Sequence, residues 1–301
     1  MSKRIFTLYL ALLCSVATMA QYYNMPQEIV DQLKATTTVF FYSKQQTTEI
    51  ELIKQAVTDG WKLTPVIFED ISSYSKYASD PKYSFFIIEG SSSQVYYDHH
   101  HYSINYYYIQ LRIFDKIDKD GNVRTAGLCR IELYPNTKTL FTDNGKADQI
   151  IEKLYRKGGF YNWSPILLKA QLESVADNLE HNVLPKQYNE FKDKDLKNIL
   201  SGDTLYVPQR MLVNFSALTG KESEKDEKIF EGYRYKYRIC TDDELFDIFQ
   251  ISKRGRLLFE YVKSAADKFI TIYDLKQKKA IYRNYVALSE NLKSRDIKNI
   301  K

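Results

Sequence analysis

Apolar residues along the first half of the chain recur with two periods, and these predict helices alternating with strands. Ile29, Val30 and Leu33 follow helical spacing, whereas the β-branched and aromatic run at 36–42 is typical of a strand. The pattern predicts a helix over 26–34, a strand over 36–42, a helix over 48–58, a strand over 63–68, a short helix over 71–78, a short strand over 85–89, and long alternating strands over 105–117 and 123–134. The last two strands form a hairpin, because Asp120-Gly121 between them suits a tight turn.

The second half of the chain shows the same order of elements. Thr241 and Glu244 have the spacing of a capping box, which begins a helix. The pattern predicts a helix over 195–200, a strand over 204–207, a helix over 222–230, a strand over 235–239, a helix from Thr241 through 249, a strand over 257–262, and a hairpin of strands over 269–274 and 280–286. Gly60 and Gly232 end the corresponding helices of the two halves, as a C-terminal glycine does.

The two halves are also related in sequence. The string at 60–70 aligns without gaps on the string at 232–242, with a glycine, an aromatic residue, a basic residue, a strand and an aspartate in the same order. We therefore predict an α/β (α+β) fold of two tandem related domains, each helix-strand-helix-strand-short helix-strand-β-hairpin, joined by a helical spacer. The predicted domains are 21–145 and 191–301, and the spacer is 146–190. A chain of 301 residues has room for two such cores.

Two helices are predicted in the spacer. One covers 147–156, and a longer one covers 165–182 with Leu168, Leu172 and Leu179 along one stripe. A flexible linker would contain more glycine, serine or proline, so we predict a rigid spacer that packs against one or both domains.

Residues 1–20 have the pattern of a signal peptide. Lys3 and Arg4 precede an apolar run over 5–17, and small residues at Thr18 and Ala20 predict cleavage after Ala20. The run is shorter than the roughly 20 residues that cross a bilayer, and no later segment is apolar enough, so no transmembrane segment is predicted in the mature chain. We expect a periplasmic or secreted protein. Lipoprotein anchoring at Cys14 is the alternative, although Leu13 stands where such signals usually carry a small residue.

Charge and cysteine content narrow the function classes. The net charge is +5, and the basic residues are scattered among acidic ones without a long basic run. The sequence therefore lacks the electrostatic footprint of nucleic-acid binding. Cys129 and Cys240 remain after removal of the leader, and both interpretations stay open: two buried thiols, or a disulfide formed after export.

The most distinctive local feature is the string Asp98-His99-His100-His101. On an extended chain His99 and His101 point to one side, so Asp98, His99 and His101 are the candidate metal ligands. The string lies in 91–104, an insertion that the second half replaces with the short segment 264–267. A solvated surface loop explains the same composition, and pH sensing is a further alternative.

Tyrosine is abundant, with 25 copies. Tyr96, Tyr97 and Tyr102 beside the histidines are candidates for stacking on a sugar or peptide, and half-buried sheet is the alternative.

No motif predicts a catalytic centre or a cofactor. The string from Asp118 to Asn122 begins like a calcium loop, but the position that needs a carboxylate is Cys129. Thr219-Gly220-Lys221 lacks the earlier glycine of a phosphate loop, and Gly-x-Ser-x-Gly is absent from the sequence.

The repeated unit resembles a known domain. The strings that carry the resemblance are Tyr-Ser-Phe-Phe-Ile-Ile-Glu-Gly at 83–90, Ile-Gln-Leu-Arg-Ile-Phe-Asp at 109–115, Val-Arg-Thr-Ala at 123–126, and Ile-Thr-Ile-Tyr-Asp-Leu-Lys-Gln-Lys-Lys-Ala-Ile-Tyr at 270–282. They resemble the α/β domain shared by the N-terminal part of the Tol–Pal system's periplasmic propeller protein, the curli-secretion lipoprotein and the outer-membrane lipoprotein activators of peptidoglycan synthases. The resemblance implies a non-catalytic binding module of the bacterial envelope. The propeller and the pore-forming strands of those proteins are absent, so their specific activities are not implied.

The sequence thus favours a non-enzymatic scaffold that binds another envelope protein or a cell-wall glycan. An exported metal-binding protein or metal-dependent hydrolase that uses His99 and His101 is one alternative. A carbohydrate-binding protein with a tyrosine-rich surface is the other.

Overall fold

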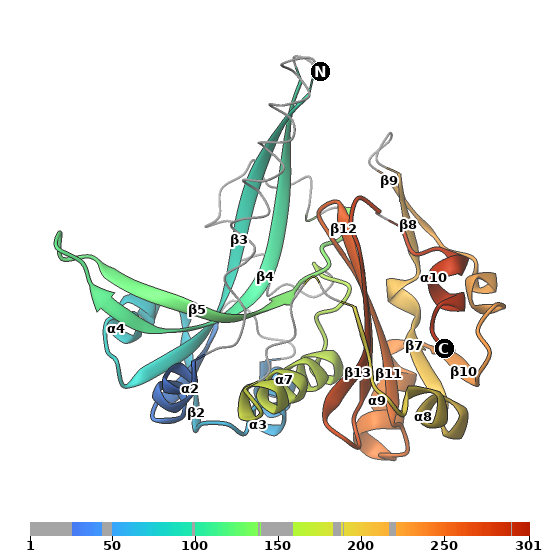
Figure 1. Cartoon of the computed structure of the whole chain (residues 1–301), viewed down its shortest axis with the longest axis horizontal. Coiled ribbons are helices and arrows are strands. Elements are labelled where there is room, and N and C mark those ends of the chain that lie inside the picture. The colour runs from blue at the N-terminus through green and yellow to red at the C-terminus, as the bar shows by residue number, and fades with distance from the viewer. Residues whose placement is uncertain are drawn as a thin grey trace.

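Two mixed β-sheets with the same strand order form the framework of the protein (Figure 1). The structure is a computed structural model, and it describes residues 26–43, 50–97, 100–137, 139, 159–182, 188, 190–216, 221–289 and 291–301. Helices and sheets are mixed throughout these residues, which confirms the predicted α/β class. Among them, no helix has the length and apolar character needed to cross a membrane.

The first sheet has the strand order β2-β1-β3-β4-β5. Its elements are α2 (Gln27–Lys34), β1 (Thr37–Tyr42), α3 (Ile50–Gly60), β2 (Val66–Asp70), η1 (Ile71–Ser73), α4 (Tyr74–Ala78), β3 (Tyr83–Tyr97), β4 (His100–Ile117) and β5 (Val123–Glu132). β1 pairs in parallel with β2 and β3, and β3, β4 and β5 form an antiparallel meander. The strands carry apolar residues on both faces because helices cover both: Phe40 and Phe86 pack with α2 and α3, whereas Phe41 and Phe85 pack with α4.

The second sheet has the order β10-β7-β11-β12-β13-β6. Its elements are β6 (Phe191–Lys192), α8 (Leu196–Gly202), β7 (Leu205–Pro208), η2 (Gln209–Met211), β8 (Val213–Ser216), β9 (Lys221–Glu224), η3 (Glu227–Phe230), β10 (Tyr237–Cys240), α9 (Asp242–Phe246), η4 (Asp247–Ile251), β11 (Leu257–Ser264), β12 (Asp267–Asp274), β13 (Lys279–Val286) and α10 (Ser294–Lys298). β7 is parallel to β10 and β11, and β11, β12 and β13 form an antiparallel meander. Apart from the added β6, strand order and directions match those of the first sheet.

The helix α7 (Pro165–Glu180) lies between the two sheets and packs on both (Figure 1). Leu168, Leu172 and Leu179 join the core on the α2 and α3 side of the first sheet, as the predicted stripe requires. Ile166 and Leu167 join the core on the α9 side of the second sheet. Because α4 and α9 occupy equivalent places in the strand order, α7 covers opposite faces of the two sheets. We call the first sheet with its helices the first unit, and the second sheet with its helices the second unit. Non-equivalent faces of the two units therefore meet at α7.

The insertion at 91–104 differs from the predicted surface loop. β3 and β4 continue through it as one ladder, from Ser91 paired with Tyr106 to Tyr97 paired with His100. We call residues 91–97 and 100–106 the ribbon, and Figure 1 shows it rising away from both sheets. The strand predicted at 85–89 is confirmed but extends to Tyr97, and the surface-loop interpretation of 91–104 is wrong. Pairing of the two strands with each other forms this ladder without an apolar pattern.

Another expected element is also different. Residues 222–230, predicted as a helix, form β9 and the short 3₁₀ helix η3. β9 pairs with β8, and this two-stranded sheet stands where the first unit has α3. The run of charged residues at 221–228 carried no strand period, and pairing with β8 decides its structure. The helix predicted at 147–156 lies outside the described residues.

Other local predictions are confirmed. Thr241 and Glu244 form the capping box that begins α9. Gly121, with φ of 81°, turns the chain between β4 and β5, and Asp118 accepts hydrogen bonds from the amides of Asp120 and Asn122. α3 ends at Gly60, and this glycine has a second role. A Cβ there would lie 2.8 Å from the carbonyl oxygen of Lys169, so the glycine allows α3 to approach α7 closely.

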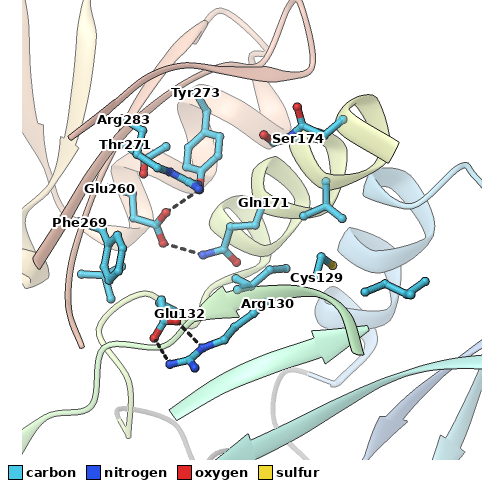
Figure 2. Close-up of a pocket in the computed structure, with 15 residues that line it drawn as sticks. Cys129, Arg130, Glu132, Gln171, Ser174, Glu260, Phe269, Thr271, Tyr273 and Arg283 are labelled. Carbon is cyan, nitrogen blue, oxygen red and sulfur yellow. Dashed lines mark hydrogen bonds and ion pairs between the residues drawn. The ribbon is translucent and has the colours of Figure 1, made fainter. Parts of the chain in front are cut away.

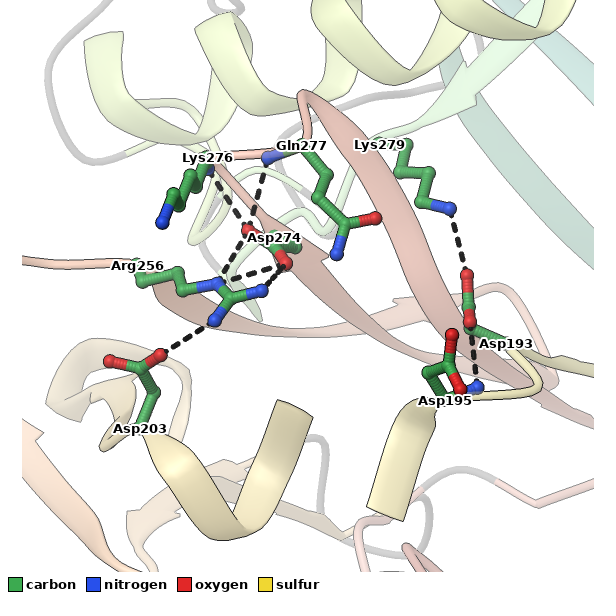
Figure 3. A network of polar contacts seen from close by, with 8 residues as sticks. All are labelled: Asp193, Asp195, Asp203, Arg256, Asp274, Lys276, Gln277 and Lys279. Atoms are coloured by element: carbon green, nitrogen blue, oxygen red, sulfur yellow. Dashed lines mark hydrogen bonds and ion pairs between the residues drawn. The ribbon is translucent and has the colours of Figure 1, made fainter. Parts of the chain in front are cut away.

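A buried polar network fixes the β12–β13 turn of the second unit (Figure 3). Asp274 is fully buried and accepts hydrogen bonds from the guanidinium of Arg256 at 2.6–3.0 Å and from the amides of Lys276 and Gln277. Arg256 also donates to Asp203 at 2.8 Å. These donors occupy the carboxylate oxygens of Asp274, so we interpret this network as structural.

Candidate functional site

A cavity of about 90 Å³ lies between the two sheets, beside α7 (Figure 2). We call it the seam cavity. β5 supplies one wall, α7 a second, and β11, β12 and β13 a third. Its lining residues are Leu128, Cys129, Arg130, Ile131, Glu132, Gln171, Ser174, Val175, Asn178, Glu260, Val262, Phe269, Thr271, Tyr273 and Arg283. Small-molecule sites commonly lie where two units meet and combine apolar walls with a few polar groups, so this cavity is the candidate site.

Glu260 is the central polar residue of the seam cavity. Its place in β11 puts it on the same face as Leu258 and Val262, and its side chain is 4% exposed. Burial raises the pKa of Glu260 because it disfavours the charged carboxylate. Tyr273 donates to Oε2 at 2.6 Å, which opposes this shift, and burial raises the pKa of the Tyr273 phenol well above its usual value.

Two amides complete the hydrogen bonds of Glu260. Gln171 on α7 donates to Oε1 at 2.6 Å, and Asn162 donates to the same oxygen at 2.9 Å. Asn162 also donates to the backbone oxygen of Glu132 at 2.8 Å and accepts from the amide of Tyr134 at 2.8 Å. This single buried amide therefore connects the end of β5 in the first unit with the carboxylate of Glu260 in the second.

A second carboxylate lies at the other end of the cavity. Glu132 pairs with Arg130, with 2.5 Å between Nε and Oε1 and 3.0 Å between the terminal nitrogen and Oε2. Ser264 of the second unit donates to the same carboxylate. Burial raises the pKa of Glu132, and the charge of Arg130 opposes the shift. The guanidinium of Arg130 lies 3.7 Å from the ring centroid of Tyr108, which adds a cation–π contact.

Arg283 on β13 is less completely paired. Figure 2 shows its side chain beside Thr271 and Tyr273, on the same wall as Glu260. Its Nε is buried, and among the described residues no acceptor reaches that atom. An unpaired buried donor costs free energy, so a ligand that accepts a hydrogen bond from Arg283 would gain affinity.

The cavity is arranged for binding more than for covalent chemistry. Burial raises the pKa of the Cys129 thiol to about 12, so this residue is not an activated nucleophile. Glu260 already accepts from three neutral donors, which leaves it poorly placed as a general base. Within the described ranges no group of three or more His, Cys, Asp and Glu side chains has the geometry of a metal site.

The candidates taken from the sequence lie elsewhere, on the ribbon. Asp98 and His99 fall outside the described residues. The ladder pairs Tyr96 with His101 and Val95 with Tyr102, and it places Tyr97 opposite His100 at the end of the ribbon. The backbone therefore brings the predicted tyrosines and His101 into one hairpin. Cys129 and Cys240 are free thiols, as one of the two interpretations expected, but only Cys240 is buried and Cys129 is partly exposed.

The polar residues of the seam cavity were not among the site residues predicted from the sequence. The usable signal was Glu260, a charged residue inside the apolar string Leu-Leu-Phe-Glu-Tyr-Val. Such a position requires partners, because an unpaired buried charge is very costly. The partners Gln171 and Asn162 come from the connecting segment, and the sequence gives no indication of that pairing.

Comparisons of the chain with protein-family models, with curated proteins and with solved structures find no match.

Proposed function

We propose that the chain is an exported cell-envelope protein that acts without catalysis, by presenting the ribbon to another envelope protein or to a cell-wall glycan. The observation that carries this proposal is an asymmetry between two units of equal strand order. β3 and β4 extend through the ribbon, whereas β11 and β12 close with Ser264 paired to Asp267. Because the fold closes in the second unit without such an extension, we infer that the ribbon of the first unit serves binding and not folding.

The ribbon has free edges that suit a partner strand. β3 pairs with β1 only over Tyr83–Phe86, and β4 pairs with β5 only from Tyr108 onward. In the described part of the chain, the outer edges of residues 91–97 and 100–106 therefore pair with no third strand. An exposed strand edge can accept a partner strand through backbone hydrogen bonds, so a protein partner that adds a strand is the one we favour.

The proposed duplication supports a scaffold role. We infer that the units at 21–145 and 191–301 arose from one ancestral domain, because their strands share order and direction. The proposal also includes the leader at 1–20 and its removal after Ala20. The resemblance to envelope binding domains supports it. N-terminal sequencing of protein recovered from the periplasmic fraction tests the leader.

Site-specific crosslinking tests the ribbon. A photoreactive residue at Ser92 or Gln94 is expected to capture a reproducible envelope partner, whereas the same residue at Lys116, beyond the opposite end of the ladder, is expected not to. A second variant replaces residues 92–105 with a two-residue turn like that between Ser264 and Asp267, so that the turn joins the paired residues Ser91 and Tyr106. If this shortened protein folds and still co-purifies with the partner, the ribbon is not the binding element. If neither ribbon position captures a protein or a glycan, the proposed function is wrong.

A metal site at the ribbon tip is the second candidate. The last described pair of the ladder is Tyr97 with His100, and Asp98 and His99 lie between these two residues in the sequence, outside the described residues. Metal analysis of untagged protein tests it, with His99→Ala and His101→Ala beside the unaltered chain. A negligible metal content that neither substitution changes would exclude this function.

A further inference from the structure

The described polar groups of the seam cavity that can still form a hydrogen bond are donors. Glu260 accepts at both oxygens, and Arg130 holds Glu132. Within the described residues, Nε of both Arg130 and Arg283 is buried without a hydrogen-bond acceptor. Nε of Arg130 still lies 2.5 Å from Oε1 of Glu132 as an ion pair, whereas no ion pair is found for Arg283 among these residues. Ser174 accepts from the amide of Ala280 at 3.2 Å, so its hydroxyl hydrogen is available to a ligand. A molecule that completes this site has to supply an acceptor.

The remaining walls are apolar and set the size of the ligand. Phe269, Val262, Ile131 and Val175 line the same space. A cavity of about 90 Å³ has room for several water molecules, and therefore for a short organic acid. Arg283 and Asn178 keep partial exposure, so the lining of the cavity reaches solvent at these two residues.

The charges of the lining accommodate an anion. Arg130 and Glu132 neutralise each other, which leaves Arg283 and Glu260. Burial raises the pKa of Glu260, so this carboxyl takes up a proton at lower cost than an exposed one does. Neutral Glu260 keeps its three partners, because its hydroxyl can donate to the oxygen of Tyr273 while the other oxygen still accepts from Gln171 and Asn162. The cavity then carries one uncompensated guanidinium, that of Arg283.

We propose that the seam cavity binds a small monocarboxylate, with the carboxylate accepting from Arg283 and the short hydrocarbon chain lying against Phe269 and Val262. The ligand contacts β11, β12 and β13 of the second unit and faces β5 of the first, so it fills the space between the units. The site lies apart from the ribbon, and its test uses the purified chain alone. Its outcome is therefore independent of the proposed envelope function.

The ligand-observed NMR experiment compares propionate and butyrate with propionamide and butyramide at equal ionic strength. We expect saturation transfer to the acids, a higher thermal midpoint in their presence, and neither effect with the amides. Arg283→Met is expected to weaken binding of the acids about ten- to a hundredfold, as loss of a charged hydrogen-bond donor does. Arg124→Met is the matched control, because Arg124 pairs with Asp118 at the far end of β5 and does not line the cavity.

A pH series adds a second readout. The groups that face Glu260 are Tyr273, Arg283, Gln171 and Asn162. If the ligand enters with a proton on Glu260, affinity for propionate falls as the pH rises, and Glu260→Gln removes most of that dependence. Equal binding of the acids and the amides would show that the cavity does not select a carboxylate, and it would overturn the proposal. Binding that is unchanged in Arg283→Met, or no binding of either acid, would overturn the proposal. Arg283→Lys serves if the methionine variant fails to fold, because it keeps the charge but loses the planar fork.

Discussion

The side-chain amide of Gln171 donates to the carboxylate of Glu260, with 2.6 Å between Nε2 and Oε1. Gln171 lies on α7, which contributes Leu168 and Leu172 to the core of the first sheet, and Glu260 lies in the middle of β11 in the second. This contact therefore joins the two units through a carboxylate that is shielded from water. We therefore expect the free energy of unfolding to depend on the charge of the Glu260 carboxylate.

Stability should respond to pH through Glu260. Its folded-state pKa is raised by burial, so its contribution is fully present below the unfolded value of about 4.3 and is lost as the pH rises through the folded value. Glu260→Gln removes this titration and keeps the hydrogen bonds, because an amide can donate to Tyr273 and accept from Gln171 and Asn162. We expect the free energy of unfolding of the variant, relative to that of the unaltered chain, to be higher at about pH 8 than at about pH 5. Urea denaturation at the two pH values measures it, and a pH-independent difference would contradict the assignment.

The helices and strands were easier to predict from the sequence than the contacts between the two sheets. Strands such as 36–42 and 257–262 carry their own apolar period, so they can be recognised locally. A surface loop was one interpretation of the ribbon, because its serines and histidines show no such period. The contacts of Glu260 depend on how the second sheet docks against α7, and docking of opposite faces is not encoded in any local pattern. Arg283 could not be placed for the same reason.

Close approach of α3 and α7 makes Gly60 intolerant of a side chain. A Cβ at Gly60 would lie 2.8 Å from the carbonyl oxygen of Lys169 and 3.2 Å from Cβ of Leu172, so one helix has to move. We expect Gly60→Ala to lower the free energy of unfolding by about 1–3 kcal/mol. Gly202→Ala at the end of α8 is the matched control, because a Cβ there would meet no atom within 4 Å. That change should be neutral or stabilising by up to about 1 kcal/mol. Equal effects of the two substitutions in thermal and urea unfolding would show that α3 and α7 are not in close contact.

A buried ion pair holds the C-terminal helix α10 to β12. Lys268 is fully buried, and its Nζ lies 2.5 Å from Oδ2 of Asp296 and 3.0 Å from the backbone oxygen of Asn291. Burial lowers the pKa of Lys268, and Asp296 opposes that shift. Asp296→Asn leaves the ammonium without its counter-charge, so we expect a loss of about 3–5 kcal/mol in the free energy of unfolding. Glu51→Gln removes the exposed pair with Lys54 and should cost less than about 1 kcal/mol. Similar losses in the two variants would mean that water reaches Lys268.

The two cysteines should react slowly in the folded chain. Burial raises the pKa of Cys129 to about 12 and raises that of Cys240, and both residues are unpaired. Since the thiolate is the reacting species, iodoacetamide at about pH 7.5 should modify the native protein far more slowly than the urea-unfolded protein. Peptide mass spectrometry then finds both Cys129 and Cys240 alkylated after unfolding without a reductant. A disulfide between them would block alkylation until the reductant is added, and it would also require the β5 and β10 strands of different units to meet. Fast native labelling of Cys129 would show instead that the seam opens, because this thiol lines the cavity between the two sheets.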